Sequence, residues 1–371
     1  MLVGLWVAVA TLLLLTLIPL SRIEAWWVRG LDFPRLQLSC LALIVALAVL
    51  GLLDREQPST WIMLTLSLAC LCYHALWIVP YTPLHSKEVR AAGALSEKDR
   101  AQRIAIMTAN VLTPNRNAEG LLAMVAHHRP DVLVTLESDD WWQKQLDALE
   151  PEYPYTIKCP QDNLYGMHVY SRYPLKNAAL QFLVEEDVPS MHAEAVLPSG
   201  RRVVLHFLHP APPSPSENET SSERDAELVM VGRSVAKSGA PAIVTGDLND
   251  VAWSATTRLF RKVSGLLDPR IGRGMFNSFH ADYPFIRWPL DHLFHSDDFV
   301  LENIQRLSSF GSDHFPVLVR LVYRERAKPQ EGIEPDTEDR QLAQEKMEDE
   351  AVSPGEVHRP ELSLLATGVL G

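Results

Sequence analysis

Polar residues repeatedly follow short apolar runs in the middle and C-terminal parts of this 371-residue chain. In layered α/β proteins, ligands bind at strand ends, because loops converge there while the sheet holds them rigid. We therefore expect one site to be built from the polar residues in such positions. They are Asn110, Glu137, His209, Asp247, Asn249, Asp291, Asp313 and His314.

Two local motifs are more specific than the rest. The sequence Gly-Asp-Leu-Asn runs from Gly246 to Asn249 after an apolar run. Glycine permits an unusual backbone, and polar residues two apart point the same way on an extended segment. The sequence Ser-Asp-His at 312–314 places an acid beside an imidazole. A turn would explain either motif alone, but the complete ordered set favours a functional site.

The donor types indicate a hard cation. Carboxylates and carboxamides supply the oxygen ligands that Mg²⁺ prefers, and Mn²⁺ is an alternative. The chain has four cysteines and no His-x-x-x-His pair, so zinc is less favoured. The sequence therefore predicts a Mg²⁺ site among these residues.

Short runs rich in Val, Ile and Leu predict buried strands in the segment that carries these residues. The expected strands are residues 103–109, 132–136, 168–171, 203–208, 242–245, 292–295 and 317–321. Apolar residues at helical spacing predict helices over 118–128 and 224–237. Several strands are joined by stretches too short for a crossover helix, which indicates mixed sheets. We expect residues 103–323 to form one domain of two packed sheets covered by helices.

Three uncharged apolar blocks open the chain, at residues 1–20, 36–53 and 61–80. Each has about the length that a helix needs to cross a bilayer. We predict a three-helix transmembrane anchor over residues 1–80 and a juxtamembrane linker over 81–102. A cleaved signal peptide is the alternative for the first block, but that block lacks a basic start and an obvious cleavage site.

The basic residues around these blocks predict an orientation. The first loop carries Arg22, Arg29 and Arg35, and the second carries only Arg55, while further bases follow the third block. The positive-inside rule then places the N-terminus outside and the large domain in the cytoplasm. Cys159 is the lone cysteine beyond the anchor, which fits the cytoplasm without excluding the periplasm.

The C-terminal tail, residues 324–371, is strongly acidic. From residue 327 onward acids outnumber bases eleven to four, so the tail supplies most of the net charge of −12. Few apolar residues precede Leu362, and this composition predicts a disordered segment. The rest of the chain is mildly acidic and has no basic stripe, which argues mildly against tight, non-specific nucleic-acid binding.

The ordered set of motifs resembles the endonuclease/exonuclease/phosphatase superfamily, which contains DNase I-like nucleases, apurinic endonucleases, sphingomyelinases and inositol-phosphate phosphatases. The resemblance covers about residues 103–323. The matching segments are Thr-Ala-Asn at 108–110, Pro-Asp-Val-Leu-Val-Thr-Leu-Glu at 130–137, Tyr-Ser-Arg-Tyr-Pro at 170–174, His-Pro at 209–210, Gly-Asp-Leu-Asn at 246–249, Pro-Leu-Asp-His at 289–292 and Ser-Asp-His-Phe-Pro-Val at 312–317. The resemblance implies a four-layered α/β sandwich of two mixed β-sheets flanked by helices.

The resemblance also implies metal-dependent phosphoesterase activity and assigns the ligands. Asn110 and Glu137 resemble the metal-binding pair, with Glu137 as the principal ligand, and Asp313 resembles a second ligand. A metal on Glu137 would neutralise charge that develops during in-line attack on a phosphoester.

The remaining residues resemble the catalytic set. Asp247 would orient or deprotonate the attacking water, and Asn249 would position water and phosphate. His314 would contact the scissile phosphate, and Asp291 would pair with an active-site histidine. His209 occupies a phosphate-contacting position. Whether Asp291 pairs with His209 or with His314 remains open from the sequence.

One residue departs from a simple match, and one matching residue has two interpretations. His168 stands where a small or apolar residue is expected, which puts the local geometry in doubt. Arg172 is better interpreted as a surface ion-pair residue than as a phosphate contact. The other histidines of the domain, His127, His128, His280, His292 and His295, are assigned surface or core roles.

Three membrane helices followed by such a domain look like a bacterial membrane-bound branch, which implies a multi-pass protein of the inner membrane. Membrane lipid would contact the N-terminal helices, and the substrate would be a nucleic acid, a lipid head group or a small phosphodiester or phosphomonoester. No obligate protein partner is inferred. The alternative function is a catalytically silent binding or scaffold module on the same fold.

Overall fold

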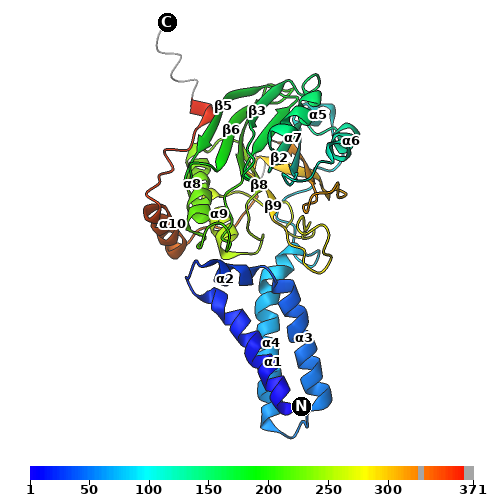
Figure 1. Cartoon of the computed structure of the whole chain (residues 1–371), viewed down its shortest axis with the longest axis vertical. Helices are drawn as coiled ribbons and strands as arrows, with labels where there is room; N and C mark the ends of the chain where they lie inside the picture. The colour runs from blue at the N-terminus through cyan, green and yellow to red at the C-terminus, as the bar shows by residue number, and fades with distance from the viewer. Residues whose placement is uncertain (325–329, 363–371) are drawn as a thin grey trace. The chain divides into compact units, whose positions relative to one another are not determined.

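The computed structural model describes residues 1–324 and 330–362. The chain divides into two compact units (Figure 1). The smaller unit comprises Met1–Ser86 with the short segments Pro213–Ser221 and Gly272–Gly274. The larger unit comprises the remaining residues and contains every candidate site residue.

The smaller unit is helical. Its long helices are α1 (Leu2–Leu17), α3 (Arg35–Leu52) and α4 (Pro58–Ile78). With 3₁₀ turns after α1 and α4, they form three segments long and apolar enough to cross a membrane, with mean hydropathies of 2.4, 2.1 and 2.0. The shorter elements are η1 (Ile18–Leu20), α2 (Trp26–Arg29), η2 (Gly30–Asp32) and η3 (Val79–Tyr81).

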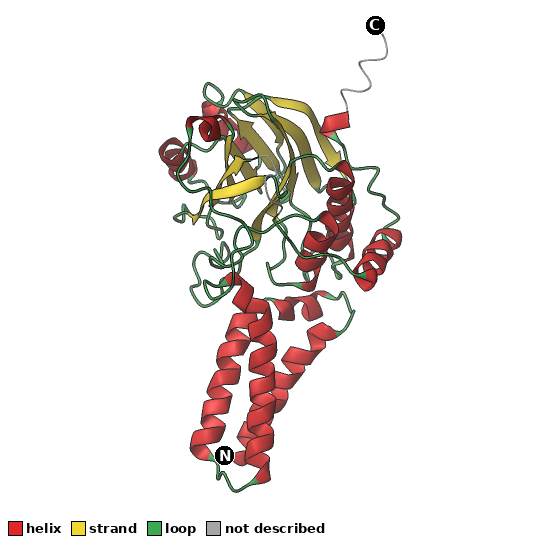
Figure 2. Cartoon of the chain, turned by 180° about the vertical axis from the view of Figure 1, so that it is seen from behind, coloured by secondary structure: helices red, strands yellow, loops and turns green. Residues whose placement is uncertain are grey.

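The larger unit contains two mixed sheets (Figure 2). The first has the order β10-β11-β1-β2-β4-β3, and the second has the order β5-β6-β7-β8-β9. The pairs β1/β2 and β7/β8 are parallel, and the other neighbours are antiparallel. The strands are β1 (Arg103–Asn110), β2 (Val132–Leu136), β3 (Tyr155–Cys159), β4 (Met167–Ser171), β5 (Leu175–Phe182), β6 (Pro189–Val196), β7 (Arg202–Leu208), β8 (Ala242–Asp247), β9 (Asp291–His295), β10 (Phe299–Arg306) and β11 (Val317–Tyr323).

Helices cover the outer faces of both sheets. The helices of this unit are α5 (Glu97–Ala101), α6 (Ala118–His128), α7 (Asp140–Leu146), η4 (Asp147–Leu149), α8 (Ser222–Ser238), α9 (Ala255–Ser264), α10 (Thr337–Asp349) and η5 (Pro360–Leu362). Apolar residues of α6 and α7 pack on the first sheet, and those of α8, α9 and α10 pack on the second. A third apolar cluster joins the inner faces of the two sheets. These are the four layers that the sequence predicts.

Central strands are apolar throughout because both of their faces are buried. In β1, Ile104 and Ile106 face the other sheet, whereas Ala105 and Met107 pack toward the outer helices. Successive strand residues point to opposite faces, so a strand between two layers needs apolar residues at every position. This explains why such runs can be recognised in the sequence.

The prediction of a disordered tail is wrong for the part of the tail that the structure describes. Residues 337–349 form α10, which begins with a capping box between Asp336 and Asp339. Ala343 and Met347 are buried in the cluster shared with α8 and α9. Acidic composition misleads here because a short helix needs only a narrow apolar stripe to dock. The predicted tail residues 325–329 and 363–371 lie outside the described residues.

Candidate active site

Strand ends from both sheets carry the predicted residues. Asn110 ends β1, and Glu137 follows β2, its parallel neighbour. In the second sheet Asp247 ends β8, while Asp291 opens β9 directly opposite it. The Thr108 hydroxyl of β1 lies 2.9 Å from the Thr245 hydroxyl of β8, so the two sheets meet just below these ends.

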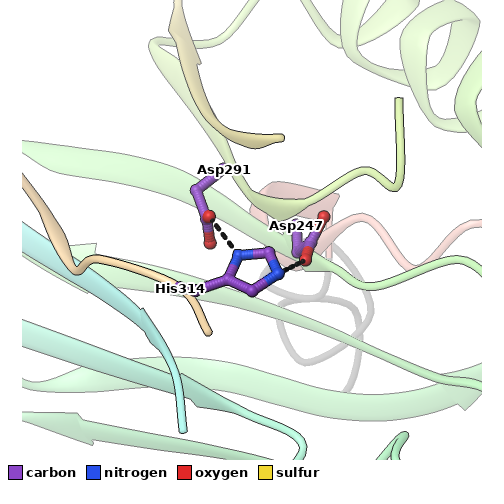
Figure 3. A group of neighbouring side chains, drawn as sticks. All are labelled: Asp247, Asp291 and His314. Atoms are coloured by element: carbon purple, nitrogen blue, oxygen red, sulfur yellow. Dashed lines mark hydrogen bonds and ion pairs between the residues drawn. The ribbon is translucent and has the colours of Figure 1, made fainter. Parts of the chain in front are cut away.

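His314 lies between two aspartates (Figure 3). Its Nδ1 is 2.7 Å from Asp291 Oδ2, and its Nε2 is 3.5 Å from Asp247 Oδ2. The three side chains are at most 6% exposed. Burial disfavours the charged imidazole, but Asp291 and Asp247 outweigh it and raise the pKa of His314 to about 10. His314 is therefore a protonated imidazolium at neutral pH, and the open choice of partner for Asp291 is resolved.

A close approach of two strands explains the glycine before Asp247. A Cβ on Gly246, whose φ is +152°, would lie 1.8 Å from the carbonyl oxygen of Leu208 on β7. Asp247 Oδ1 then accepts a 2.9 Å hydrogen bond from the backbone N–H of Asn249. Burial raises the pKa of Asp247. Asn249 has a left-handed backbone with φ of +50°, and its side-chain Nδ2 donates to the Pro210 carbonyl at 3.0 Å.

Asn110 and Glu137 form a buried pair. Asn110 Nδ2 donates to Glu137 Oε1 at 2.6 Å and lies 3.4 Å from Asp247 Oδ2. The other carboxylate oxygen of Glu137, Oε2, is buried without a hydrogen-bond partner among the described residues. Burial raises the pKa of Glu137 to about 7. An orphaned, desolvated carboxylate oxygen is costly unless a cation satisfies it, so this pair fits a divalent metal.

A second group of donor atoms could also be read as a metal site. One ligand atom from each of Asp247, Asp291 and His314 lies within 4.8 Å of the others. However, Asp291 and Asp247 raise the pKa of His314, so a proton on this ring would balance these two carboxylates in place of a metal. We therefore favour Glu137 over this triad as the place for a metal.

The other two predicted residues lie at the edge of this network. His209 is buried, its Nδ1 has no hydrogen-bond partner among the described residues, and burial lowers its pKa to about 4. His209 is thus a neutral imidazole, and the centre of its ring lies 5.5 Å from that of Tyr165. Asp313 is close enough that its negative charge raises the pKa of both Glu137 and His314. Its role as a metal ligand stays a prediction.

Sequence reasoning missed several residues that hold the site. The Ser312 hydroxyl donates to the Asn110 carbonyl at 2.8 Å, which ties the loop before β11 to the end of β1. Thr113 Oγ1 donates to the Glu137 carbonyl at 2.8 Å. Arg224 of α8 donates to the Asn249 carbonyl at 2.9 Å. Such side-chain-to-backbone contacts have no spacing rule that would reveal them in a sequence.

His168 and Arg172 both contact neighbouring side chains of the fold. The His168 ring is buried on β4, with Nδ1 2.6 Å from the Ser138 hydroxyl and Nε2 3.3 Å from Gln143. It therefore supports the turn that follows Glu137. The Arg172 guanidinium lies 5.8 Å from the centre of the Tyr153 ring.

The profile of the Endonuclease/Exonuclease/phosphatase family matches residues 107–314, more than half of the chain. The chain belongs to this family. The two mixed sheets flanked by helices are the DNase I-like fold that the motifs imply, and membership makes the chain a metal-dependent phosphoesterase.

Several solved structures are similar to this endonuclease/exonuclease/phosphatase family member. A family protein from Beutenbergia cavernae shares 17% identity over 60% of this chain and 72% of its own, with a TM-score of 0.48. TDP2 from D. rerio, complexed with single-strand DNA product, shares 17% identity over 59% and 98%, with a TM-score of 0.49. The human Nocturnin catalytic domain shares 16% over 60% and 95%, with a TM-score of 0.48. No curated protein matches the chain.

Proposed function

We propose that this chain is a membrane-anchored phosphodiesterase that uses Mg²⁺, with Mn²⁺ as a substitute, to hydrolyse its substrate by in-line attack of water. The observation that carries the proposal is the buried His314 ring between Asp291 and Asp247, close enough to influence the pKa of Glu137, whose Oε2 is unsatisfied. A fixed cation and a free carboxylate oxygen in one buried site match the charge that a phosphoryl transfer develops.

Glu137 and Asn110 would hold the metal, with Asp313 as a further ligand. The metal would supply a Lewis acid that neutralises phosphate oxygen charge. The pairing of Asn110 with Glu137 at 2.6 Å keeps one carboxylate oxygen fixed, while the other is buried without a partner among the described residues. The ligand therefore needs little reorganisation when it binds a cation.

The remaining residues position water and phosphate. Asp247 is the carboxylate best placed to orient the attacking water, because the Asn249 N–H fixes one of its oxygens and His314 neutralises the other. His314 contributes a positive charge to the phosphate oxygens, and Asp291 keeps its ring in place. His209, which is neutral, offers a hydrogen bond rather than a charge.

The substrate is proposed only as a class: a nucleic acid, a lipid head group or a small phosphodiester. Three apolar helices that could span a membrane make a phosphodiester of a lipid or of the cell envelope as plausible as a nucleic acid. The chain outside the C-terminal tail is mildly acidic, which also disfavours a nucleic-acid substrate.

The test is hydrolysis of bis-p-nitrophenyl phosphate by the full-length protein purified in detergent. We expect activity with Mg²⁺ or Mn²⁺, loss of activity with EDTA, and a fall in kcat of at least about a hundredfold for Asp247→Ala and for His314→Ala. His127→Ala, on the outer helix α6, is the matched control and should keep full activity. EDTA-insensitive activity, or full activity of both site variants, would overturn the proposal. A panel of plasmid DNA, RNA, phosphoinositides and sphingomyelin then separates the substrate classes.

A further inference from the structure

The acidic tail contains a docked helix, α10, that carries a buried lysine. Helix α10 packs on α8 through Ala343 and Met347, and at its edge Lys262 of α9 pairs with Asp339 at 2.5 Å. Lys346 lies between the two apolar residues and is 8% exposed. A buried ammonium is costly unless it is paired and hydrogen-bonded, so its partner matters more than those of the exposed tail charges.

The partner of Lys346 is an aspartate on α8. Lys346 Nζ donates to Asp225 Oδ2 at 2.6 Å, and both side chains are at most 9% exposed. Burial opposes ionisation of Asp225, but Lys346 and Arg224 outweigh it and lower the pKa of Asp225 to about 2. The contact is therefore a full ion pair inside the packed helices.

The same aspartate holds an arginine that reaches the active-site loop. Asp225 Oδ1 accepts from Arg224 Nε at 3.1 Å and from Nη2 at 2.9 Å. The opposite end of that guanidinium, Nη1, donates to the Asn249 carbonyl at 2.9 Å, and Nη2 is 3.6 Å from Asp250. A buried chain of two acids and two bases thus runs from the tail to the loop.

The end of this chain is the segment that fixes Asp247. Asn249 sits in the left-handed region, and its N–H binds the Asp247 carboxylate. A strained backbone of this kind persists only where surrounding contacts hold it. The hydrogen bond from Arg224 to the Asn249 carbonyl is such a contact. Lys346 neutralises part of the charge of Asp225 and so sets the strength of the electrostatic attraction between Asp225 and Arg224.

We infer that Lys346 is a positioning residue for the active-site loop, so that docking of the C-terminal helix tunes catalysis. The inference rests on the proposed function for its effect on rate, but not for its effect on the loop itself. Without Lys346, Asp225 draws the Arg224 guanidinium toward itself, and the Asn249 carbonyl loses its donor. Lys346 acts on the loop through Asp225 and Arg224, so substrate binding should change little.

The test compares Lys346→Met with Lys262→Met in the full-length protein. Both variants remove a lysine contact of α10, but only Lys346 connects to Asn249. For Lys346→Met we expect kcat on the aryl phosphodiester to fall about tenfold with KM within about twofold, and Lys346→Arg to recover most of the loss. Lys262→Met should keep the wild-type kcat.

Hydrogen exchange gives a readout that does not need activity. Under Lys346→Met we expect amides in residues 246–251 to exchange about tenfold faster, whereas under Lys262→Met they should not change. The variant Asp225→Asn combined with Lys346→Met removes both charges of the Lys346–Asp225 ion pair and should restore slow exchange. This result would separate the effect of an unpaired Asp225 charge from a general loss of folding.

Equal exchange and equal kcat for Lys346→Met and Lys262→Met would overturn the inference. A parallel fall in both variants would also overturn it, because the tail would then only add general stability. If the wild type hydrolyses nothing, the proposed function fails, while the exchange comparison still decides the role of Lys346.

Discussion

At the scale of single residues, Glu137 combines an unusual backbone with an unusual environment. Its φ is +57°, a region that non-glycine residues seldom adopt. Its side chain is held by Asn110 on one oxygen and is unsatisfied on the other. Strain together with an orphaned charge is expected where a ligand supplies the missing interaction.

Glu137→Gln tests this assignment. Glutamine keeps the size of the side chain and an oxygen that can accept from Asn110, but it removes the charge. We expect the Mg²⁺ concentration for half-maximal activity to rise about tenfold or more, measured by metal titration of the rate. Glu119→Gln on the exposed face of α6 is the control. An unchanged titration would contradict the role of Glu137 as a ligand.

Residue types, spacing and the family resemblance selected the eight candidate side chains. The structure links six of them by hydrogen bonds and ion pairs, namely Asn110, Glu137, Asp247, Asn249, Asp291 and His314, and places His209 and Asp313 at the edge of this network. The sequence could not tell which histidine Asp291 holds, because His209 and His314 both lie next to apolar runs. Only the pairing of β8 with β9 and the loop before β11 decide that Asp291 meets His314. The supporting role of Ser312 was also beyond reach, since its bond to Asn110 spans 202 residues of chain.

At the scale of elements, the approach of β7 to β8 sets a steric limit at Gly246. Gly246→Ala places a methyl group against the Leu208 carbonyl, and backbone atoms cannot move aside as a flexible side chain can. We expect a loss of about 3 kcal/mol or more in stability, with activity lost as well.

Gly200→Ala is the matched control for Gly246→Ala. Gly200 also has a positive φ, of +82°, but nothing lies within 4 Å of the added Cβ. Its cost should be only that of the backbone conformation, about 1 kcal/mol. Thermal unfolding of the full chain in detergent measures both. Equal losses would mean that the close approach to Leu208 is unimportant.

A buried histidine pair makes the β6/β7 contact sensitive to acid. His192 Nδ1 lies 2.7 Å from His206 Nδ1, and both rings are buried. Burial, with the neighbouring imidazoles including His358, lowers the pKa of His192 well below its usual value and that of His206 to about 3. The folded state therefore excludes protons that the unfolded state binds below pH 6.5.

The contribution of this histidine pair to the free energy of unfolding should be fully present above pH 6.5 and should be lost as the pH falls toward 3. The slope is about 1.4 kcal/mol per pH unit for each histidine. The double variant His192→Leu with His206→Leu should take up nearly two fewer protons on unfolding, so its free energy of unfolding should depend less steeply on pH. The variant His127→Leu on α6 should keep the wild-type pH dependence. Unfolding measured between pH 7 and 4 checks this, and parallel profiles for the double variant and wild type would refute it.

Elements were predictable where an uninterrupted apolar run or a clear helical spacing marks them in the sequence. The strand expected at 132–136 and the helix expected at 118–128 have the same bounds in the structure. Strand β6 is buried on both faces, but it was missed because Ser190, His192 and Glu194 interrupt its apolar residues. Strand β5 was missed because it lies at a sheet edge, has alternating half-buried and exposed residues and contains a bulge after Lys176. Helix α10 was missed because an acidic surface masks its small buried stripe.

At the scale of the whole molecule, the membrane orientation is the main open prediction. Three spans would put the N-terminus and the catalytic domain on opposite sides of the membrane. The arginines of the first loop predict a cytoplasmic domain.

Reporter fusions expressed in bacteria decide the orientation. Alkaline phosphatase fused after Gly371 should be inactive, and green fluorescent protein at the same position should fluoresce. Alkaline phosphatase inserted at residues 54–57, between the second and third spans, is the control and should be active outside. The reverse pattern would place the catalytic domain on the outer side.

The two sheets divide the site between them. The first sheet brings Asn110 and Glu137, and the loop before its strand β11 brings His314, whereas the second sheet brings Asp247 and Asp291. The ion pairs of His314 therefore bridge the seam where Thr108 meets Thr245. A slide of one sheet past the other by about an ångström would cost about a hundredfold in rate while leaving each sheet intact. The turnover rate therefore reports on how well the two sheets are aligned. We expect mild denaturant to abolish activity at a lower concentration than the one that changes the circular dichroism signal.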